Sequence, residues 1–265
     1  MTLSSEARAL HDSTPVIDLH GDTLMVMRHG YDFFKRHRRM PLSALTSHID
    51  EPRMRQGGHD AQVFGLVTSP VGRAPFESAR QQVEVLWSTA ATRPAALKVV
   101  TEAHEIRAAR EAGARAGLLG LEGVHALQGD LANLDHLAQR GLRLCGLSHF
   151  SANEAAYPAI GRGRNDSRGL TRHGTEVVER CNELGVLVDL AHINRKGFLE
   201  AARLTRDPVV VSHTGVCGIK DIRRNIDDEQ IRAVADSGGV IGTIFAINFV
   251  GWRGGIDAVV NHIEH

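Results

Sequence analysis

The sequence is short of cysteine, has no excess of either charge and contains no long apolar run. Its three cysteines lie far apart without a CxxC pair, so neither a disulfide framework nor a thiolate zinc site is indicated. Lys and Arg number 31, as do Asp and Glu, which excludes binding to nucleic acid through bulk charge. Because no run approaches the roughly 18 to 20 residues that span a bilayer, and the N-terminus lacks the apolar core of a secretory signal, the sequence predicts a cytoplasmic protein without a membrane segment.

Histidine, by contrast, is abundant. The 265 residues include 15 His but 4 Lys, against 27 Gly and a hydrophobic fraction of 42%. This is otherwise the composition of an ordinary globular protein. The length suits one large α/β domain, since barrels often run to about 250 residues, and we therefore expect a single domain over residues 1–265.

Short apolar runs recur along the chain, and most are followed by a stretch of helical length. The runs are 15–20, 61–67, 116–122, 142–149, 185–192, 208–213 and 239–245. Apolar residues at helical spacing lie between several of them, at 77–91, 131–140, 175–184 and 227–237. The repeated order of strand and helix predicts an α/β fold with a parallel sheet.

Two parallel architectures fit this order, an open doubly wound sheet and a closed TIM (β/α)8 barrel. A doubly wound nucleotide-binding sheet carries GxGxxG after its first strand, whereas His20-Gly21-Asp22 follows here. This difference favours the barrel, whose active site lies at the carboxyl ends of the strands. The chain ends within the seventh helix, at residues 259–265, so we expect the eighth strand and the C-terminal helices to be missing from it.

Acidic residues and histidines are placed where these strands end. His20 and Asp22 are two residues apart, so in a strand both side chains point to one face. Glu122 ends an apolar run, and a carboxylate there either faces solvent, pairs with an arginine or binds a cation. In all, four of the seven runs end in His and a fifth ends in Glu. A single strand-end His is more often structural, but the coincidence of several indicates a metal site.

The number of candidate ligands exceeds what one catalytic zinc ion uses. They are His20, Asp22, Glu122, His192 and His213. A catalytic zinc normally takes three protein ligands and keeps a position open, so two ions bridged by a carboxylate fit these five groups better. Imidazole and carboxylate ligands without a thiolate suit Zn²⁺, and Mn²⁺ or Co²⁺ can use the same set.

At this level of detail the chain resembles a known family, the membrane dipeptidase (renal dipeptidase) family of zinc peptidases, family M19, whose members have amidohydrolase-like barrels. The similar segments are 16–23, 117–127, 142–149, 167–192, 209–219 and 223–225. They follow in the family's order and cover nearly the whole chain. The HxD motif together with a strand-end Glu is specific, because the commoner motif in related barrels is HxH.

The resemblance implies a role for each of the candidate ligands. His20 and Asp22 correspond to the ligands of one zinc ion, and His192 and His213 correspond to those of the other. Glu122 corresponds to the carboxylate that bridges both ions. The family's further catalytic Asp belongs to an eighth strand, and no residue of this chain corresponds to it.

The resemblance also implies residues that contact the substrate. His149 corresponds to the histidine that stabilises the carbonyl oxygen, and Glu122 and His149 are therefore the candidate catalytic residues. Arg224 corresponds to the residue that binds the dipeptide's terminal carboxylate, which agrees with the bidentate pairing of Arg with planar carboxylates. Without the resemblance, Arg223 and Arg224 read equally well as a solvated pair.

The implied activity is hydrolysis of the peptide bond of free dipeptides by a hydroxide that bridges two zinc ions. Two alternatives remain open: hydrolysis of another amide or a β-lactam at the same site, and an inactive, truncated metal-binding fragment. The expected partner is a small dipeptide, and the sequence leaves open whether the barrel forms a homodimer. The remaining histidines, His262 among them, are expected at the surface or in loops, and His125, three residues after Glu122, is left undecided.

Overall fold

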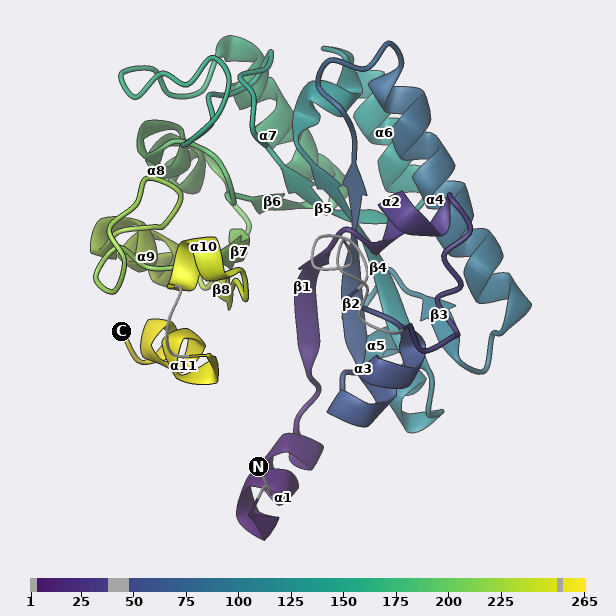
Figure 1. The fold of residues 1–265 in the computed structure, drawn as a ribbon. Helices are drawn as coiled ribbons and strands as arrows, with labels where there is room; N and C mark the ends of the chain where they lie inside the picture. Colours follow the sequence, from purple (N-terminus) through teal and green to yellow (C-terminus); the bar gives the residue numbers. More distant parts are fainter. Residues whose placement is uncertain (1–3, 38–47, 252–254) are drawn as a thin grey trace. The chain divides into compact units, whose positions relative to one another are not determined.

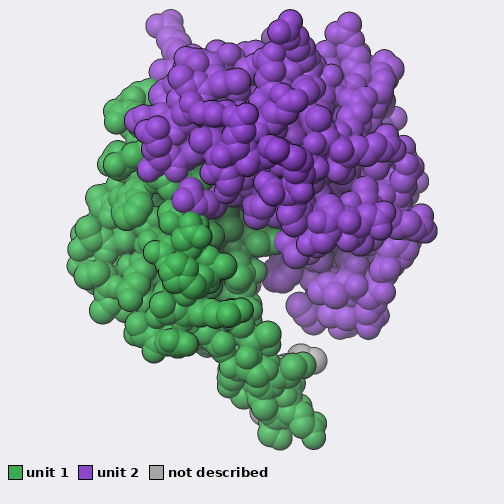
Figure 2. Space-filling view, turned by 180° about the vertical axis from the view of Figure 1, so that it is seen from behind, with its two compact units in different colours: residues 1–67, 77–120, 140–142 green, residues 68–76, 121–139, 143–265 purple. Residues whose placement is uncertain are grey.

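The computed structural model describes residues 4–37, 48–251 and 255–265. The chain divides into two compact units, which Figure 2 shows in different colours. Unit 1 comprises Met1–Val67, Glu77–Gly120 and Arg140–Leu142, and unit 2 comprises Thr68–Phe76, Leu121–Gln139 and Arg143–His265. The single domain over residues 1–265 stays a prediction.

Unit 1 is built around parallel strands (Figure 1). They are β1 (Ile17–Gly21), β2 (Ala61–Val67), β3 (Leu97–Val99) and the first six residues of β4 (Arg115–Glu122). The order of hydrogen-bonded neighbours is β1-β2-β4, and the short β3 pairs with β4 beside this path. Every residue of β2 is buried, as expected for the apolar run at its centre.

Several helices of unit 1 begin at side-chain caps. The helices of this unit are α1 (Ser5–Ser13), α2 (Thr23–Met27), α3 (Glu51–Gly57), most of α4 (Pro75–Thr92) and α5 (Ala103–Glu111). At α1 the Ser4 side chain accepts a hydrogen bond from the backbone N–H of Ala7 at 3.1 Å. At α5 Glu102 and Glu105 form a reciprocal capping box, which satisfies backbone donors that the helix itself leaves open.

Unit 2 continues the series of parallel strands from the last two residues of β4. The further strands are β5 (Leu142–Gly146), β6 (Leu187–Asp189), β7 (Val210–Thr214) and β8 (Val240–Thr243). Their hydrogen-bonded order is β4-β5-β6-β7-β8, which is again the order along the chain. Leu144 lies opposite Leu187, and Val210 lies opposite both Asp189 and Val240.

Helices alternate with these strands along the chain, and two further helices in the described part of the chain follow β8 (Figure 1). The helices of unit 2 are the 3₁₀ helix η2 (Val124–Leu127), α6 (Leu131–Gln139), α7 (Arg172–Leu184), α8 (Arg195–Leu204), α9 (Asp228–Asp236), α10 (Ile247–Val250) and α11 (Ile256–Glu264). Neighbours along the series α6 to α9 pack against each other. Gly185 ends α7 at a φ of 64°, as the Leu184-Gly185 step predicts.

The predicted fold class, an α/β chain of the TIM-barrel type, is confirmed. All seven predicted strands are present in parallel, and neighbours in the sheet follow the chain order, as they do in (β/α)8 barrels. Within the described residues this path holds seven strands, one fewer than a complete barrel. No described helix combines the length and apolar character needed to cross a membrane.

Candidate metal centre

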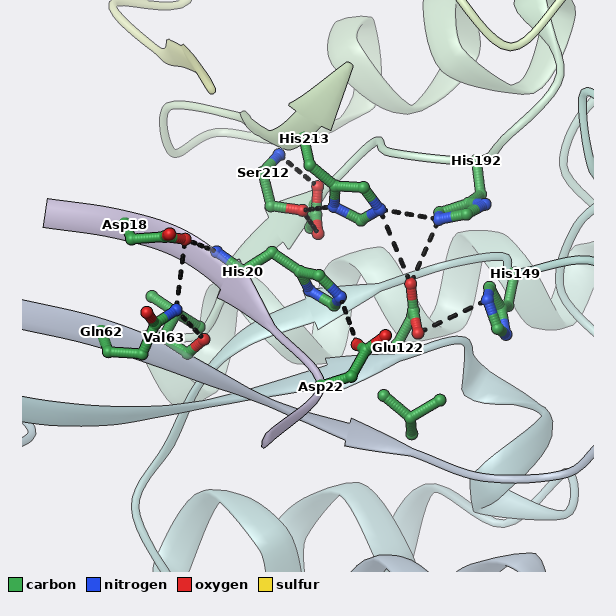
Figure 3. Close-up of polar contacts among 12 residues, drawn as sticks. Asp18, His20, Asp22, Gln62, Val63, Glu122, His149, His192, Ser212 and His213 are labelled. Carbon is green, nitrogen blue, oxygen red and sulfur yellow. Dashed lines mark hydrogen bonds and ion pairs between the residues drawn. The ribbon is translucent and has the colours of Figure 1, made fainter. Parts of the chain in front are cut away.

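In unit 1, His20 and Asp22 form the first pair of candidate ligands. His20 lies on β1 and Asp22 directly precedes α2, and His20 Nε2 lies 2.8 Å from Asp22 Oδ1 (Figure 3). The Gly65 backbone makes room for the ring, because a Cβ atom there would stand 2.9 Å from His20 Cε1. An imidazole nitrogen and a carboxylate oxygen are thus close together, but Asp22 lies beyond the end of β1, so the predicted alternation within a strand is not what brings them together.

The backbone that carries this pair is held by Asp18. Its Oδ1 atom accepts hydrogen bonds from the backbone N–H of His20 at 2.9 Å and from Gln62 Nε2 at 3.2 Å. Gln62, which is fully buried, also donates to the carbonyl oxygen of Val63 at 3.0 Å. These bonds fix His20 on β1 against β2. Neither Asp18 nor Gln62 was identified as a site residue from the sequence.

In unit 2, Glu122 stands among three histidines. Its Oε1 atom lies 3.1 Å from His192 Nε2 and 3.6 Å from His213 Nε2. Its Oε2 atom lies 3.4 Å from His149 Nε2 (Figure 3). The candidate ligand atoms of Glu122, His149 and His192 all lie within 4.8 Å of one another. Glu122 is buried, so its charge requires these partners or a cation.

The position of His192 depends on a bend after β6. The sequence predicts strand structure up to His192, but β6 ends at Asp189, and His192 adopts a φ of +68°. This left-handed conformation is costly for a residue with a side chain and is found at sites where the surroundings enforce it. Here the carbonyl oxygen of His192 accepts a hydrogen bond from Ala159 N at 2.7 Å, so the loop after β5 holds the bend.

His213 lies on β7 and belongs to a chain of buried polar groups. Its Nδ1 atom is 2.8 Å from Ser212 Oγ, and Ser212 Oγ donates to Asp189 Oδ2 at 2.6 Å. Its Nε2 atom is 2.8 Å from His192 Nε2. Asp189 and Ser212 were not identified as site residues from the sequence, because 23 positions separate them and no short motif links them.

Arg224 is buried in the loop between β7 and α9, not solvated. Its Nη2 atom donates to the carbonyl oxygen of His213 at 2.9 Å, and its guanidinium lies over the Phe249 ring at 5.6 Å. Burial lowers the pKa of Arg224 to about 10, although the charges of Glu122 and Asp189 act against this shift. Nε of Arg224 has no hydrogen-bond partner among the described residues.

A cavity of about 570 Å³ lies beside this arginine in unit 2. Arg224 and His192 both line it, together with Cys217 and Ile222. The cavity thus offers one buried guanidinium and one imidazole to whatever occupies it. Four acidic residues also line the cavity, Asp166, Glu200, Asp221 and Asp227. An anionic group of a small ligand therefore fits at Arg224 and not along the whole wall.

Two of the other histidines are buried, which corrects the expectation for one of them. His262 was expected at the surface or in a loop, but it is buried on α11, where its Nδ1 accepts from Val216 N at 2.9 Å and its Nε2 faces the carbonyl oxygen of Val250 at 3.2 Å. His125, left undecided, is buried with its Nε2 bonded to Thr68, and burial lowers its pKa. Both histidines hold loops together.

The chemistry of these donors fits a metal ion. Zinc in proteins is bound by imidazole nitrogen and carboxylate oxygen. Here the Nε2 atoms of His192 and His213 lie 3.1 Å and 3.6 Å from Oε1 of Glu122. Two imidazole nitrogens 2.8 Å apart beside a buried carboxylate are held closer than solvated side chains would be. The cluster therefore has the donor set of a zinc site.

Comparison with known proteins connects this arrangement to one family. The sequence pattern of the membrane dipeptidase family (peptidase family M19) matches residues 4–265. Dipeptidase tcpJ of Claviceps purpurea (strain 20.1) is 26% identical in an alignment of length 265. The alignment covers 94% of this chain and 61% of tcpJ. The chain thus spans about three fifths of the length of that relative.

Two solved structures share the fold over most of their length. One is a metallopeptidase from Rhodobacter sphaeroides with a bound phosphinate mimic of the dipeptide L-Ala-D-Ala, at 27% identity and a TM-score of 0.82, over 95% of this chain and 81% of that one. The other is dipeptidase AC, a metallopeptidase of family M19, at 28% identity and a TM-score of 0.82, over 95% of this chain and 80% of that one.

Proposed function

Because the chain belongs to the membrane dipeptidase family, peptidase family M19, we propose that it is a zinc-dependent dipeptidase that hydrolyses the peptide bond of free dipeptides. The observation that carries the proposal is the buried Glu122 carboxylate among three imidazoles, in the same unit as a buried Arg224. Together these groups supply the two things that such a reaction needs, a site for a Lewis acid and a cation for the substrate carboxylate.

We assign the metal ligands by the chemistry of their atoms and by the family. His20 and Asp22 would hold one zinc ion, and His192 and His213 would hold the second. By the family's pattern, Glu122 would be the carboxylate ligand that both ions share. Bound zinc ions polarise a carbonyl group and lower the pKa of water toward neutrality. Mn²⁺ or Co²⁺ can substitute, because the set contains nitrogen and oxygen donors without a thiolate.

Arg224 binds the carboxylate of the dipeptide. Its guanidinium is already out of water, so pairing with a carboxylate gains interaction energy without a further desolvation cost for the arginine. The bond to the His213 carbonyl oxygen orients the planar group, while Nε remains available within the described residues. Recognition of the terminal carboxylate would restrict the enzyme to short, free substrates.

His149 stabilises the oxygen of the scissile carbonyl. Its ring lies beside the cluster, with ring centroids 4.8 Å from His192 and 4.5 Å from Phe150. A proton at Nε2 of His149 can be donated to an oxyanion, and such a preorganised donor is worth about 2.7–4 kcal/mol in related sites. This Nε2 atom lies 3.4 Å from Glu122 Oε2, so it is placed at the edge of the cluster where the scissile carbonyl would bind.

A substrate panel tests the proposal against the alternative amide and β-lactam hydrolases. The zinc-loaded chain is assayed on L-Ala-D-Ala, the dipeptide whose mimic is bound in the Rhodobacter sphaeroides relative, on its N-acetyl and C-terminal amide derivatives, and on a β-lactam. We expect hydrolysis of the free dipeptide and a much slower reaction with the amide derivative. Faster cleavage of the N-acetyl compound or the β-lactam would overturn the dipeptidase assignment.

A further inference from the structure

We propose that Asp189, acting through the hydroxyl of Ser212, fixes the tautomer of His213 so that its Nε2 atom presents a lone pair to a metal ion. The inference rests on the proposed zinc site and adds two positioning residues to it. Neither residue is a metal ligand in the assignment above. Their role is to determine which ring nitrogen of His213 carries the proton in the metal-free protein.

Asp189, the last residue of β6, is an acceptor at both carboxylate oxygens. Its Oδ1 atom accepts from the backbone N–H groups of Ala191 at 3.0 Å and Ser212 at 2.9 Å. Its Oδ2 atom accepts from the Ser212 hydroxyl at 2.6 Å. Three donors thus converge on one buried carboxylate, and this leaves the Ser212 hydroxyl proton committed to Asp189.

Ser212 must then accept, not donate, in its contact with His213. A hydroxyl has one proton, and if that proton pointed to His213, two acceptor oxygens would face each other at 2.6 Å. The 2.8 Å contact between Ser212 Oγ and His213 Nδ1 is therefore an N–H donated by the ring. A neutral imidazole has one N–H, so the other nitrogen, Nε2, carries the lone pair that a metal needs.

The same bonds also tie β6 to β7, and a purely structural role must be distinguished from a role in metal binding. Asp189→Asn separates the two. The two backbone N–H groups keep the amide oxygen in the place of Oδ1, so the amide N–H₂ takes the place of Oδ2 and donates to Ser212. The Ser212 hydroxyl then donates to Nδ1 of His213, which forces the ring proton onto Nε2.

Ser212→Ala removes the hydroxyl that connects Asp189 to His213, but it does not place a donor against Nδ1 of His213. In this variant nothing sets the tautomer, whereas Asp189→Asn favours the wrong one while keeping more of the hydrogen bonds. If the two residues choose the tautomer, Asp189→Asn should weaken zinc binding more than Ser212→Ala. If they serve the fold alone, the variant that loses fewer hydrogen bonds should be the milder one.

The tautomer can be read directly in the metal-free protein. Long-range ¹H–¹⁵N correlation spectra of protein with ¹⁵N-labelled histidine distinguish the two forms, and the signal that disappears in His213→Gln belongs to His213. We expect the Nδ1–H form in the wild type and the Nε2–H form in Asp189→Asn. An Nε2–H form in the wild type, or an unchanged tautomer in folded Asp189→Asn, would overturn the proposal.

Zinc affinity, measured by competition with a chelator, gives the second readout. We expect a loss of about 10–100-fold in Asp189→Asn, a smaller loss in Ser212→Ala and recovery in Ser212→Thr, which restores a hydroxyl. Ser237→Ala is the matched control, because the Ser237 hydroxyl bonds to Val209 N at 3.2 Å and to the Val234 carbonyl oxygen at 2.7 Å, neither in a proposed ligand.

If Asp189→Asn does not fold, the zinc affinities of Ser212→Ala and Ser212→Thr test the proposal. A higher affinity in Ser212→Thr supports it, and equal affinities in the two variants would contradict it. The spectra are recorded without metal, so they judge the tautomer separately from the metal site. A wild-type chain that takes up no zinc but shows the Nδ1–H form would contradict the proposed function while supporting the assignment of Asp189 and Ser212.

Discussion

His192, in the bend after β6, and His213, on β7, hold their Nε2 atoms 2.8 Å apart, with the Glu122 carboxylate beside both. In the metal-free protein one of these nitrogens must carry a proton, because two lone pairs at this distance repel each other. An ion that accepts both lone pairs removes that conflict. The close approach of the rings thus places two nitrogen atoms where one zinc ion could bind both. Zinc binding then requires that the proton between the two Nε2 atoms leave that position.

The first prediction concerns the Glu122 carboxylate. Glu122→Gln keeps the shape of the side chain but removes the charge that both zinc ions would share, and an amide nitrogen cannot serve as a ligand. We expect zinc affinity to fall by more than about 100-fold, since loss of a ligand should exceed the effect of losing a group that merely orients one. Chelator competition measures the change. Glu154→Gln, an exposed residue of the same unit, should leave zinc affinity unaltered.

The second prediction concerns Arg224. Arg224→Met keeps the apolar contacts of the side chain but loses the cation, so kcat/KM for a free dipeptide should fall by about 10–100-fold, the effect of one charge-assisted bond. For the dipeptide amide, which has no carboxylate to bind, the same variant should change kcat/KM little. Arg232→Met, at a side chain that is 74% exposed, is the control. An equal loss for both substrates would exclude carboxylate binding by Arg224.

The third prediction uses two helical glycines with opposite surroundings. Glycine to alanine normally stabilises a helix by about 0.5–1 kcal/mol, and Gly57 at the end of α3, with nothing near an added Cβ, should follow this rule. In α7, however, a Cβ on Gly174 would stand 2.3 Å from the carbonyl oxygen of Ala155. We expect Gly57→Ala to raise the free energy of unfolding and Gly174→Ala to lower it by about 1–3 kcal/mol in urea titrations.

The fourth prediction is a pH dependence at the start of α5. Backbone N–H groups of Thr101 at 2.7 Å and Glu102 at 2.9 Å bond to Glu105 and hold its pKa below the ordinary value of 4.5. A carboxyl whose pKa is lower in the folded state stabilises the fold above its ordinary pKa of 4.5 and loses that contribution as the pH falls from 4.5 through its lower folded pKa.

Glu105→Gln should therefore reduce the loss of unfolding free energy on acidification from about pH 5.5 to pH 3 by about 0.5–1 kcal/mol, the usual worth of a cap. Urea titrations across this range measure the difference. Glu111→Gln, at the exposed end of the same helix, is the control for the loss of one charge. If Glu105→Gln and the wild type lose the same unfolding free energy on acidification, the capping bonds do not contribute to the pH dependence.

The sequence predicts the strands well because apolar runs in a parallel sheet are buried on both faces. It overextends β6 because Leu190 and Ala191 are as apolar as the strand, although the backbone already bends there. It misses β3, whose three residues are too few to show a pattern. It also misplaces His262, since burial of a polar residue near a chain end depends on loops that the local sequence does not specify.

The candidate ligands could be identified because each ends or follows a strand, and parallel strands end on one side of the sheet. The residues that hold those ligands could not. Asp189 and Ser212 are 23 positions apart, and the link between Asp18 and Gln62 spans 44. Such pairs form through strand register, which is a property of the folded sheet. The burial of Arg224 likewise follows from tertiary packing and has no signal in the segment Arg223-Arg224-Asn225.

The most direct test of the account is a zinc titration of the metal-free chain, followed by the rate at which free alanine is released from L-Ala-D-Ala. The account predicts no alanine release without metal and a rate of release that rises with added zinc. The rate should saturate at about two zinc ions per chain. A chain that binds zinc but releases no alanine at any zinc concentration, or one that is equally active after exhaustive chelation, would contradict it.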